Sequence, residues 1–237
     1  MGRAFEVRKE SMAKTAAERS KIYSKYGKEI YMAAKSGVPD PEINVELKRV
    51  IERAKKDQVT NEVINRAIQK AKGGEVENYT NIRYEGFGPD NSLLIIDCLT
   101  DNTNRSLSDV RTVFNKFDCK LGVSGSVMHQ FYHRSYFELD ISEDQLLEIL
   151  LENDVNVIDI ESDNGTAFIY GEPEEYGNIR DVLLEHKLEI IKDEITFIPI
   201  SGVVIKEEEK LENFEKLILA LEDLEDVVNV YHNIIVE

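Results

Sequence analysis

The sequence predicts an α+β protein of three domains: an N-terminal helical bundle followed by two ferredoxin-like α/β domains, the third inserted into the second. Two observations lead to this prediction. The chain has 237 residues, which is more than one typical domain. Its hydrophobic spacing also changes after residue 75, from a helical period to a mixture of extended and helical segments. The predicted domains are residues 1–78, residues 79–133 together with 202–237, and residues 134–201.

The first domain is predicted to contain three helices. The first begins near Thr15 and is stopped by Gly37. Asp40-Pro41 marks the start of the second, and Thr60 can cap a third that ends at Gly73-Gly74. The apolar residues at helical spacing in the first helix are Ile22, Tyr26, Ile30 and Ala33. They predict one buried face.

The third domain shows a complete β-α-β-β-α-β order, the split βαβ pattern. Asn164-Gly165, between two alternating segments, is a strong signal for a β-hairpin. The predicted elements are strand 135–141, helix 142–152, strand 155–161, strand 166–171, helix 175–186 and strand 189–198.

The second domain is predicted to have the same order, with the third domain inserted at its midpoint. An extended segment at 82–86 and a turn at 88–91 precede it. Its predicted elements are strand 92–99, helix 105–118 and strand 126–132 before the insertion, then strand 203–206, helix 209–222 and strand 227–235.

Charge is divided by position along the chain. Residues 1–74 contain 17 lysines and arginines against 10 acidic residues, a net charge of +7. Residues 75–237 contain 12 against 36, a net charge of −24. Opposite charges on successive domains indicate that one domain faces a polyanion while the rest is held away from it. The alternative is an acidic protein with one solvated, lysine-rich helix.

A lysine stripe on the first helix predicts contacts with backbone phosphates. Lys14, Lys21, Lys25, Lys28 and Lys35 fall within an arc of about 80°. If about five cations contact phosphates, log affinity falls with log salt at a slope near −4 to −5. The other candidate nucleic-acid contacts are Arg8, Lys9, Arg19, Lys48, Arg49 and Lys55. The alternative is that these lysines only solvate helix surfaces.

Sequence-specific reading is not predicted, because no base-reading helix can be identified by spacing. Three tyrosines interleave with the lysines. Tyr26 is expected in the core, and Tyr23 and Tyr31 on the surface.

The loop from Thr100 to Arg105 leads into the N-terminus of a predicted helix. There it either holds an anion or, more simply, caps the helix.

Neither an enzyme nor a metal or cofactor site is predicted. The sequence shows no Ser/His/Asp set and no Cys/His pair, and Cys98 and Cys119 lack metal-ligand spacing. No apolar segment is long enough to cross a membrane, and the N-terminus lacks a signal-peptide core. A reduced, cytoplasmic setting is expected, with no membrane partner.

Several segments, in order along nearly the whole chain, resemble the YebC/PmpR family. They are 84–89 (Tyr-Glu-Gly-Phe-Gly-Pro), 99–102 with Asn104-Arg105, 122–127 (Gly-Val-Ser-Gly-Ser-Val), 226–233 (Asp-Val-Val-Asn-Val-Tyr-His-Asn), and 30–35 with 40–42 in the first domain. The opening Gly2-Arg3-Ala4-Phe5 differs from the Gly-His-Ser-Lys-Trp of many members and resembles a second subgroup.

The resemblance implies a helical first domain followed by two α/β domains, one inserted in the other. Its members include probable DNA-binding transcriptional regulators. A mitochondrial translational activator in the same family resembles ribosome-associated translation factors that relieve stalling at proline-rich stretches. The expected function is therefore regulation of gene expression by a non-enzymatic, nucleic-acid-binding protein. DNA and ribosomal or transfer RNA both stay open as targets, and the acidic domains could contact the ribosome or other proteins. By position, Arg105 and the 122–126 loop become binding candidates.

Overall fold

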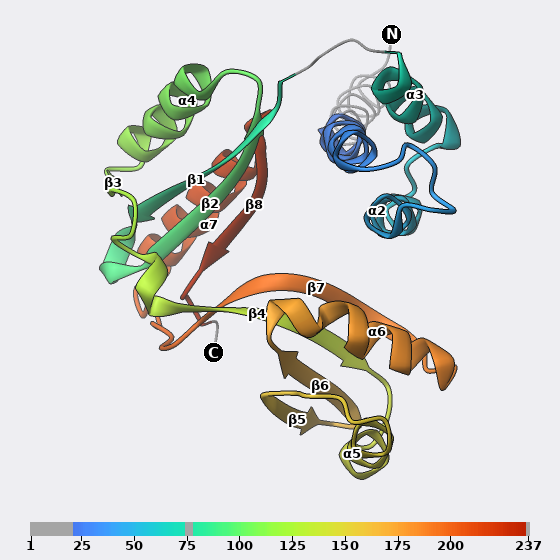
Figure 1. Ribbon diagram of the computed structural model, residues 1–237. Helices are drawn as coiled ribbons and strands as arrows, with labels where there is room; N and C mark the ends of the chain where they lie inside the picture. Colours follow the sequence, from blue (N-terminus) through green and yellow to red (C-terminus); the bar gives the residue numbers. More distant parts are fainter. Residues whose placement is uncertain (1–20, 74–77, 236–237) are drawn as a thin grey trace, which may run out of the picture. The chain divides into compact units, whose positions relative to one another are not determined.

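The computed structural model describes residues 21–73 and 78–235 (Figure 1). The chain divides into two compact units: residues 1–126 with 205–232, and residues 127–204 with 233–237. The first unit holds the helical module and one sheet, and the second holds another sheet.

The helical module consists of a helix over residues 21–36, α2 (Val45–Lys56) and α3 (Asn61–Lys72). Gly37 follows the first helix, and Thr60 and Gly73 occupy the cap positions of α3, as predicted. The second helix begins four residues later than Asp40-Pro41 suggested. Asn44 is the reason, because its side chain accepts a 3.0 Å hydrogen bond from the Leu47 N–H and caps α2 there.

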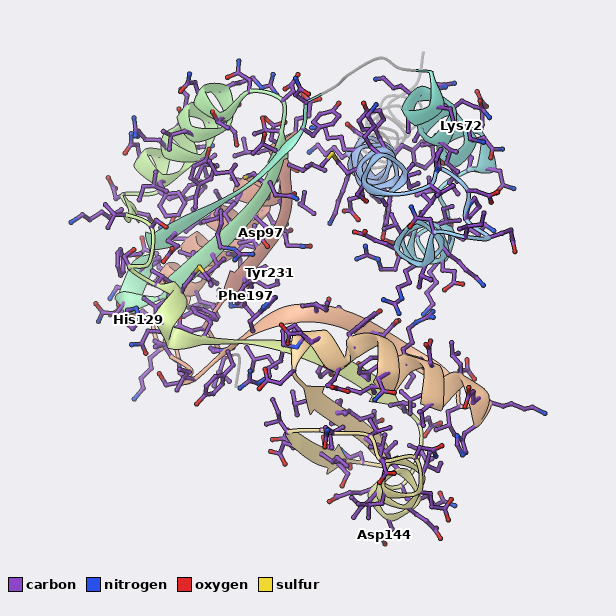
Figure 2. The ribbon with its side chains drawn as sticks, viewed as in Figure 1. Lys72, Asp97, His129, Asp144, Phe197 and Tyr231 are labelled. Carbon is purple, nitrogen blue, oxygen red and sulfur yellow. The ribbon has the colours of Figure 1, made fainter. Side chains whose placement is uncertain are left out.

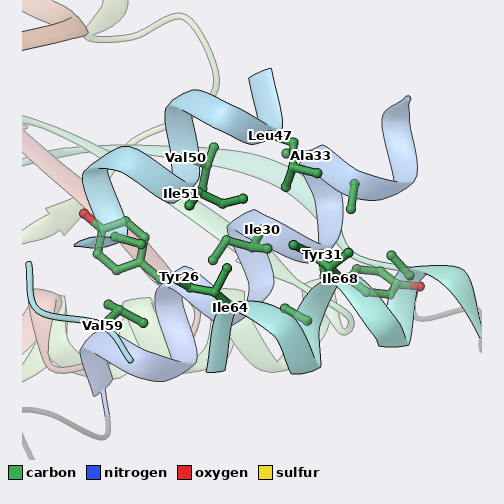
Figure 3. Packing of buried hydrophobic residues seen from close by; sticks show 14 residues of the cluster. Tyr26, Ile30, Tyr31, Ala33, Leu47, Val50, Ile51, Val59, Ile64 and Ile68 are labelled. Carbon is green, nitrogen blue, oxygen red and sulfur yellow. The ribbon is translucent and has the colours of Figure 1, made fainter. Parts of the chain in front are cut away.

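The core of this module lies among all three helices (Figure 3). Ile30 and Leu47 are fully buried, and Tyr26 is buried as predicted. The surface placement of Tyr31 is wrong: it is 1% exposed and packs edge-on against Tyr79, with ring centroids 5.9 Å apart. Because the first helix packs against both α2 and α3, its buried face is wider than one stripe. Ile22, expected on that face, is 37% exposed.

The sheet of the first unit has the strand order β3-β1-β2-β8 and is antiparallel throughout. Its strands are β1 (Thr80–Phe87), β2 (Leu93–Thr100), β3 (Lys120–Leu121) and β8 (Val227–His232). The helices α4 (Thr103–Lys116) and α7 (Glu208–Glu222) contact each other and the strands.

This sheet does not follow the predicted β-α-β-β-α-β order. Most of the predicted strand 126–132 is a turn and a short 3-10 helix, Met128–Gln130, and only its last two residues are extended, as the start of a strand in the second unit. Residues 203–206 contribute only one isolated bridge. The segment 82–86, which was predicted only to be extended and not to be part of the sheet, belongs to β1, and β1 pairs with β2 over eight residues. The physical reason is the turn between them, where Asp90 and Asn91 have positive φ values of 52° and 62° and close a hairpin.

The second unit follows the predicted order closely. Its elements are β4 (Phe131–Leu139), α5 (Glu143–Glu152), β5 (Asp159–Asp163), β6 (Thr166–Gly171), α6 (Tyr176–Glu185) and β7 (Ile190–Pro199). The strand order is β5-β6-β4-β7, and all neighbours are antiparallel. Asn164 and Gly165 have φ values of 51° and 92°, as the hairpin signal requires. Phe137 and Ile169 pack against Leu146 of α5 and Leu183 of α6, so both helices cover one face.

Gly86 on β1 offers a test of packing between the first sheet and α4. A Cβ added there would lie 2.2 Å from Phe114 Cε1. Gly86→Ala is therefore expected to lower the free energy of unfolding by about 1–3 kcal/mol, since neither the strand nor the buried ring can move freely. Urea unfolding followed by circular dichroism measures the change.

Gly27 is the matched control, because a Cβ there meets nothing within 4 Å and the residue lies inside a helix. Gly27→Ala is expected to raise stability by about 0.5–1 kcal/mol. A Gly86→Ala protein as stable as Gly27→Ala would contradict the packing of β1 on Phe114.

Candidate nucleic-acid interface

Three lysines of the stripe, Lys21, Lys25 and Lys28, contact a segment of the chain's own acidic part. Lys21 forms an ion pair with Asp223, and Lys25 donates to the Val228 carbonyl. Lys28 donates to the Glu225 carbonyl at 3.1 Å and to Asp226 Oδ1 at 2.9 Å. The spacing of three, four and seven residues that placed these lysines on one face thus aligns them along residues 223–228.

Asp226 is the centre of these contacts and is 5% exposed. Besides Lys28, its carboxylate accepts hydrogen bonds from Arg105 Nη2 at 2.9 Å and from Thr100 Oγ1 at 2.8 Å. Its backbone carbonyl accepts from the Leu99 N–H at 2.8 Å. One carboxylate therefore joins the first helix, the end of β2, the start of α4 and the loop before β8.

The positive and negative groups of this network stabilise each other's ionised forms. Burial disfavours the ionised form of Asp226, but hydrogen bonds from Lys28, Arg105 and Thr100 outweigh burial and lower its pKa below the usual value. Hydrogen bonds to Asp226 and Asp101 raise the pKa of Arg105. Arg105, a candidate nucleic-acid contact, is thus held by two carboxylates of its own chain.

The C-terminal end of α7 is a favourable place for the ammonium groups of these lysines. Four carboxylates, those of Glu222, Asp223, Glu225 and Asp226, follow one another at the C-terminal end of α7. The C-terminus of a helix carries a partial negative charge from its unpaired carbonyls, so cations nearby are favourable. The lysine stripe therefore meets an anionic surface of carboxylates and carbonyls inside the first unit.

The other candidate contacts are placed differently. Lys35, Lys48 and Lys55 are exposed, and within the described part of the chain they form no ion pair. Arg49 is half-buried. Arg8, Lys9, Lys14 and Arg19 lie outside the described residues.

The structure adds a polar face that sequence reasoning missed, on α3. Ile64, Ala67, Ile68 and Ala71 of α3 are buried. The opposite side carries exposed residues within an arc of about 80°: Asn61, Asn65, Gln69 and Lys72. Figure 2 shows Lys72 at the end of this helix. The sequence does contain this pattern, since amide side chains occur at i, i+4 and i+8 of α3. The pattern identifies an exposed face only once the buried face of the helix is known.

Two loops that resembled binding sites have structural roles. Asn102 caps α4 by accepting from the Arg105 N–H at 3.1 Å, so its side chain occupies the helix N-terminus. In the 122–126 loop, Glu85, 3% exposed, accepts hydrogen bonds from the Gly125 and Gly122 N–H groups, at its carboxylate and its carbonyl respectively. Gly125 has a φ of 83°, which favours glycine.

Neither a metal cluster nor a membrane span is found within residues 21–73 and 78–235. No group of three or more His, Cys, Asp or Glu side chains there could hold a metal ion. No helix there is both long and apolar enough to cross a bilayer.

The Asp226 network predicts an acid-dependent loss of stability. Asp226→Asn is expected to lower the free energy of unfolding by about 3 kcal/mol at pH 7, because Lys28 and Arg105 lose a buried counter-charge. The carboxyl's pKa is lowered on folding, so its contribution is present above about pH 4 and is lost as pH falls through the folded value. Urea unfolding of both proteins from pH 7 to pH 3 should show the difference shrinking.

Asp101→Asn is the control, since Asp101 also pairs with Arg105 but its side chain is 53% exposed. It is expected to change stability by less than about 1 kcal/mol. Equal losses in the two variants at pH 7 would mean that Asp226 is not the centre of the network.

Comparison with known proteins assigns the chain to a family. Residues 3–74 match the TACO1/YebC protein N-terminal domain, and residues 79–234 match the TACO1/YebC second and third domain. A protein of Acholeplasma laidlawii is 62% identical over 99% of this chain and 98% of its own, and one of Pseudoalteromonas atlantica is 49% identical over 100% and 98%. Both are named probable transcriptional regulatory protein. The crystal structure of the conserved hypothetical protein Aq1575 from Aquifex aeolicus matches with a TM-score of 0.77 and 38% identity, over 92% of this chain and 90% of that one. The chain belongs to the TACO1/YebC family, as its sequence motifs indicated.

Proposed function

We propose that this protein is a non-enzymatic, nucleic-acid-binding regulator of gene expression, and that its target is duplex DNA. The observation that carries the proposal is the exposed polar face of α3 in a positively charged domain. The names of the relatives, probable transcriptional regulatory proteins, support the same function.

The pair α2–α3 has the chemistry of a DNA-reading unit. Only residues 57–60 separate the two helices, as in a helix-turn-helix motif, whose second helix enters the major groove. Asn and Gln side chains can form two hydrogen bonds with the N6 and N7 groups of adenine. Asn61, Asn65 and Gln69 are exposed on α3 and could make such contacts.

The exposed lysines of the same domain supply affinity without sequence preference. Lys48 and Lys55 are seven residues apart on α2 and so lie on one side of it, and Lys35 lies at the end of the preceding helix. Each could neutralise a backbone phosphate and release a counterion.

The remaining candidate nucleic-acid contacts are already engaged within the chain or lie outside α2 and α3, so they are proposed as additional phosphate contacts. Lys21, Lys25, Lys28 and Arg105 could reach phosphates only by leaving the carboxylates and carbonyls near Asp226. Arg49 and the N-terminal Arg8, Lys9, Lys14 and Arg19 complete the proposed set. Variants of Lys21, Lys25 or Lys28 are poor tests, because they would disturb the fold and the interface together.

Lys48→Glu combined with Lys55→Glu is expected to weaken binding to duplex DNA. Loss of two phosphate contacts should reduce the slope of log affinity against log salt by about 2. Fluorescence anisotropy with a labelled duplex at several salt concentrations measures this slope.

The control places the same charge change on the acidic part of the first unit. Lys120 and Lys206 are exposed there, so Lys120→Glu with Lys206→Glu changes net charge equally. Equal losses of affinity in both double variants would mean that net charge, and not the α2 surface, controls binding.

Asn65→Ala with Gln69→Ala tests base reading separately. The variant is expected to keep the salt slope while losing about 1–3 kcal/mol of preference for a selected site over random duplex. Selection from a random DNA library, followed by anisotropy, provides that site. Unchanged discrimination would remove α3 as a reading helix.

Ribosomal or transfer RNA is the alternative target, in a ribosome-associated translation factor that relieves stalling at proline-rich stretches. The observation that favours it is that the exposed lysines lie in one small domain, and lysine–phosphate contacts do not distinguish RNA from DNA. Sedimentation of a lysate through a sucrose gradient separates the two. Salt-sensitive cofractionation with ribosomes, together with weak binding to DNA, would replace the first proposal by the second.

A further inference from the structure

Within residues 127–204, the sheet of the second unit has one face covered by α5 and α6 and one face that carries no helix of this segment. Side chains alternate along each strand, so Phe137 and Ile169 point to the helices whereas Tyr136, Phe168 and Tyr170 point to the other side. We call this other side the open face. Tyr136, Phe168 and Tyr170 are each half-buried there.

The three aromatic side chains form one surface on the two central strands. Tyr136 of β4 lies directly opposite Tyr170 of β6, with ring centroids 5.6 Å apart. The Tyr136 and Phe168 centroids are 6.3 Å apart, and the rings are nearly parallel. Aromatic faces carry negative electrostatic potential and attract cations placed over them.

Carboxylates surround these rings on the same face. The strand pairing places Glu138 and Glu161 beside Phe168, Asp159 beside Tyr170, and Glu194 beside Tyr136. Burial, then the charges of Glu138 and Glu194, raises the pKa of Tyr136 to about 12, in keeping with this negative surrounding. Within residues 127–204 no ion pair involves Asp159, Glu161 or Glu138.

Two cationic side chains of the same unit already lie over aromatic rings of the open face. Lys192 Nζ lies 5.5 Å from the Tyr136 ring centroid and pairs with Glu194 at 2.8 Å. On the same face, the Arg134 guanidinium lies 4.8 Å from the Tyr132 ring centroid. The β7 side thus already holds ammonium and guanidinium groups over aromatic rings, whereas Phe168, Tyr170, Asp159 and Glu161 on the β5–β6 side offer the same chemistry.

Aromatic residues on the central strands of such a sheet also stack RNA bases in RRM domains. Charge argues against that ligand here. Residues 127–204 contain 4 lysines and arginines against 18 acidic residues, a net charge of −14. A single strand of phosphates would be repelled, whereas an arginine- or lysine-rich peptide would be attracted.

The geometry points to the β5–β6 side of the open face as a docking surface for a cationic, extended segment of a partner protein. Arginine side chains of that segment stack on Phe168 and Tyr170 while Asp159 and Glu161 accept their N–H groups. The surface belongs to the second unit alone and does not depend on the nucleic-acid function proposed for the helical module.

The test uses the full chain and a nine-residue peptide of alternating arginine and glycine, measured by isothermal titration calorimetry. Asp159→Asn with Glu161→Gln is expected to weaken binding about fivefold, because two exposed charge contacts are lost. Phe168→Leu keeps an apolar side chain but removes the ring, and is expected to weaken binding about threefold. A citrulline version of the peptide should not bind.

The control is Glu148→Gln with Glu152→Gln, which removes two exposed charges from α5 on the helix-covered side. Equal weakening by the control would show attraction to overall charge and overturn the proposal. Failure of the arginine peptide to bind would overturn it too, as would binding of oligouridine that is lost in Phe168→Leu, which would make this face an RNA platform.

Discussion

The contact between the first helix and the C-terminal segment of the first unit depends on the buried carboxylate of Asp226. Asp226 accepts hydrogen bonds from Lys28 of the first helix and from Thr100 and Arg105 at the β2–α4 junction, so it joins three parts of the chain that are far apart in the sequence, its own included. A buried carboxylate is tolerated only when it is paired and hydrogen-bonded, so these donors cannot leave without a large loss of stability. The position of the lysine stripe is therefore tied to the fold of the sheet, and the stripe is a structural element before it is a binding surface.

The fold was predictable where local signals agreed with the final pairing. Asn164-Gly165 marks a hairpin by its backbone preference alone, and the order of the helices and strands around it, over residues 134–201, was predicted correctly. The first sheet was predicted only in part. The turn at 88–91 was expected, but its closing of a hairpin between β1 and β2 was not, because Asp90 and Asn91 take positive φ values there without the glycine that marks such hairpin turns most strongly. The hairpin they close places β1 in the sheet, and strand order follows from that pairing.

The candidate site was predictable only in part. Helical spacing correctly aligned Lys21, Lys25 and Lys28, since periodicity is a local property. It could not reveal what they contact, because a phosphate and a carboxylate attract an ammonium group alike, and Asp226 is about 200 residues away in the chain. The amides of α3 were overlooked for a related reason: a polar face becomes informative only after packing shows which side of the helix is free.

Two lysines of the first helix contact carboxylates and a third contacts a backbone carbonyl, and this has a consequence for the specificity of the proposed binding. Each lysine available to phosphates adds affinity for any nucleic acid, regardless of sequence, and makes binding steeper in salt. Internal contacts of Lys21, Lys25 and Lys28 would lower this general affinity, while in the proposed complex the exposed lysines of the helical module would still orient the domain on a duplex. The acidic remainder of the chain, with a net charge of −24 over residues 75–237, repels the same polyanion. Under the proposed function, discrimination between sequences would rest on the few polar side chains of α3, and this would let a chain of net charge −17 bind nucleic acid selectively.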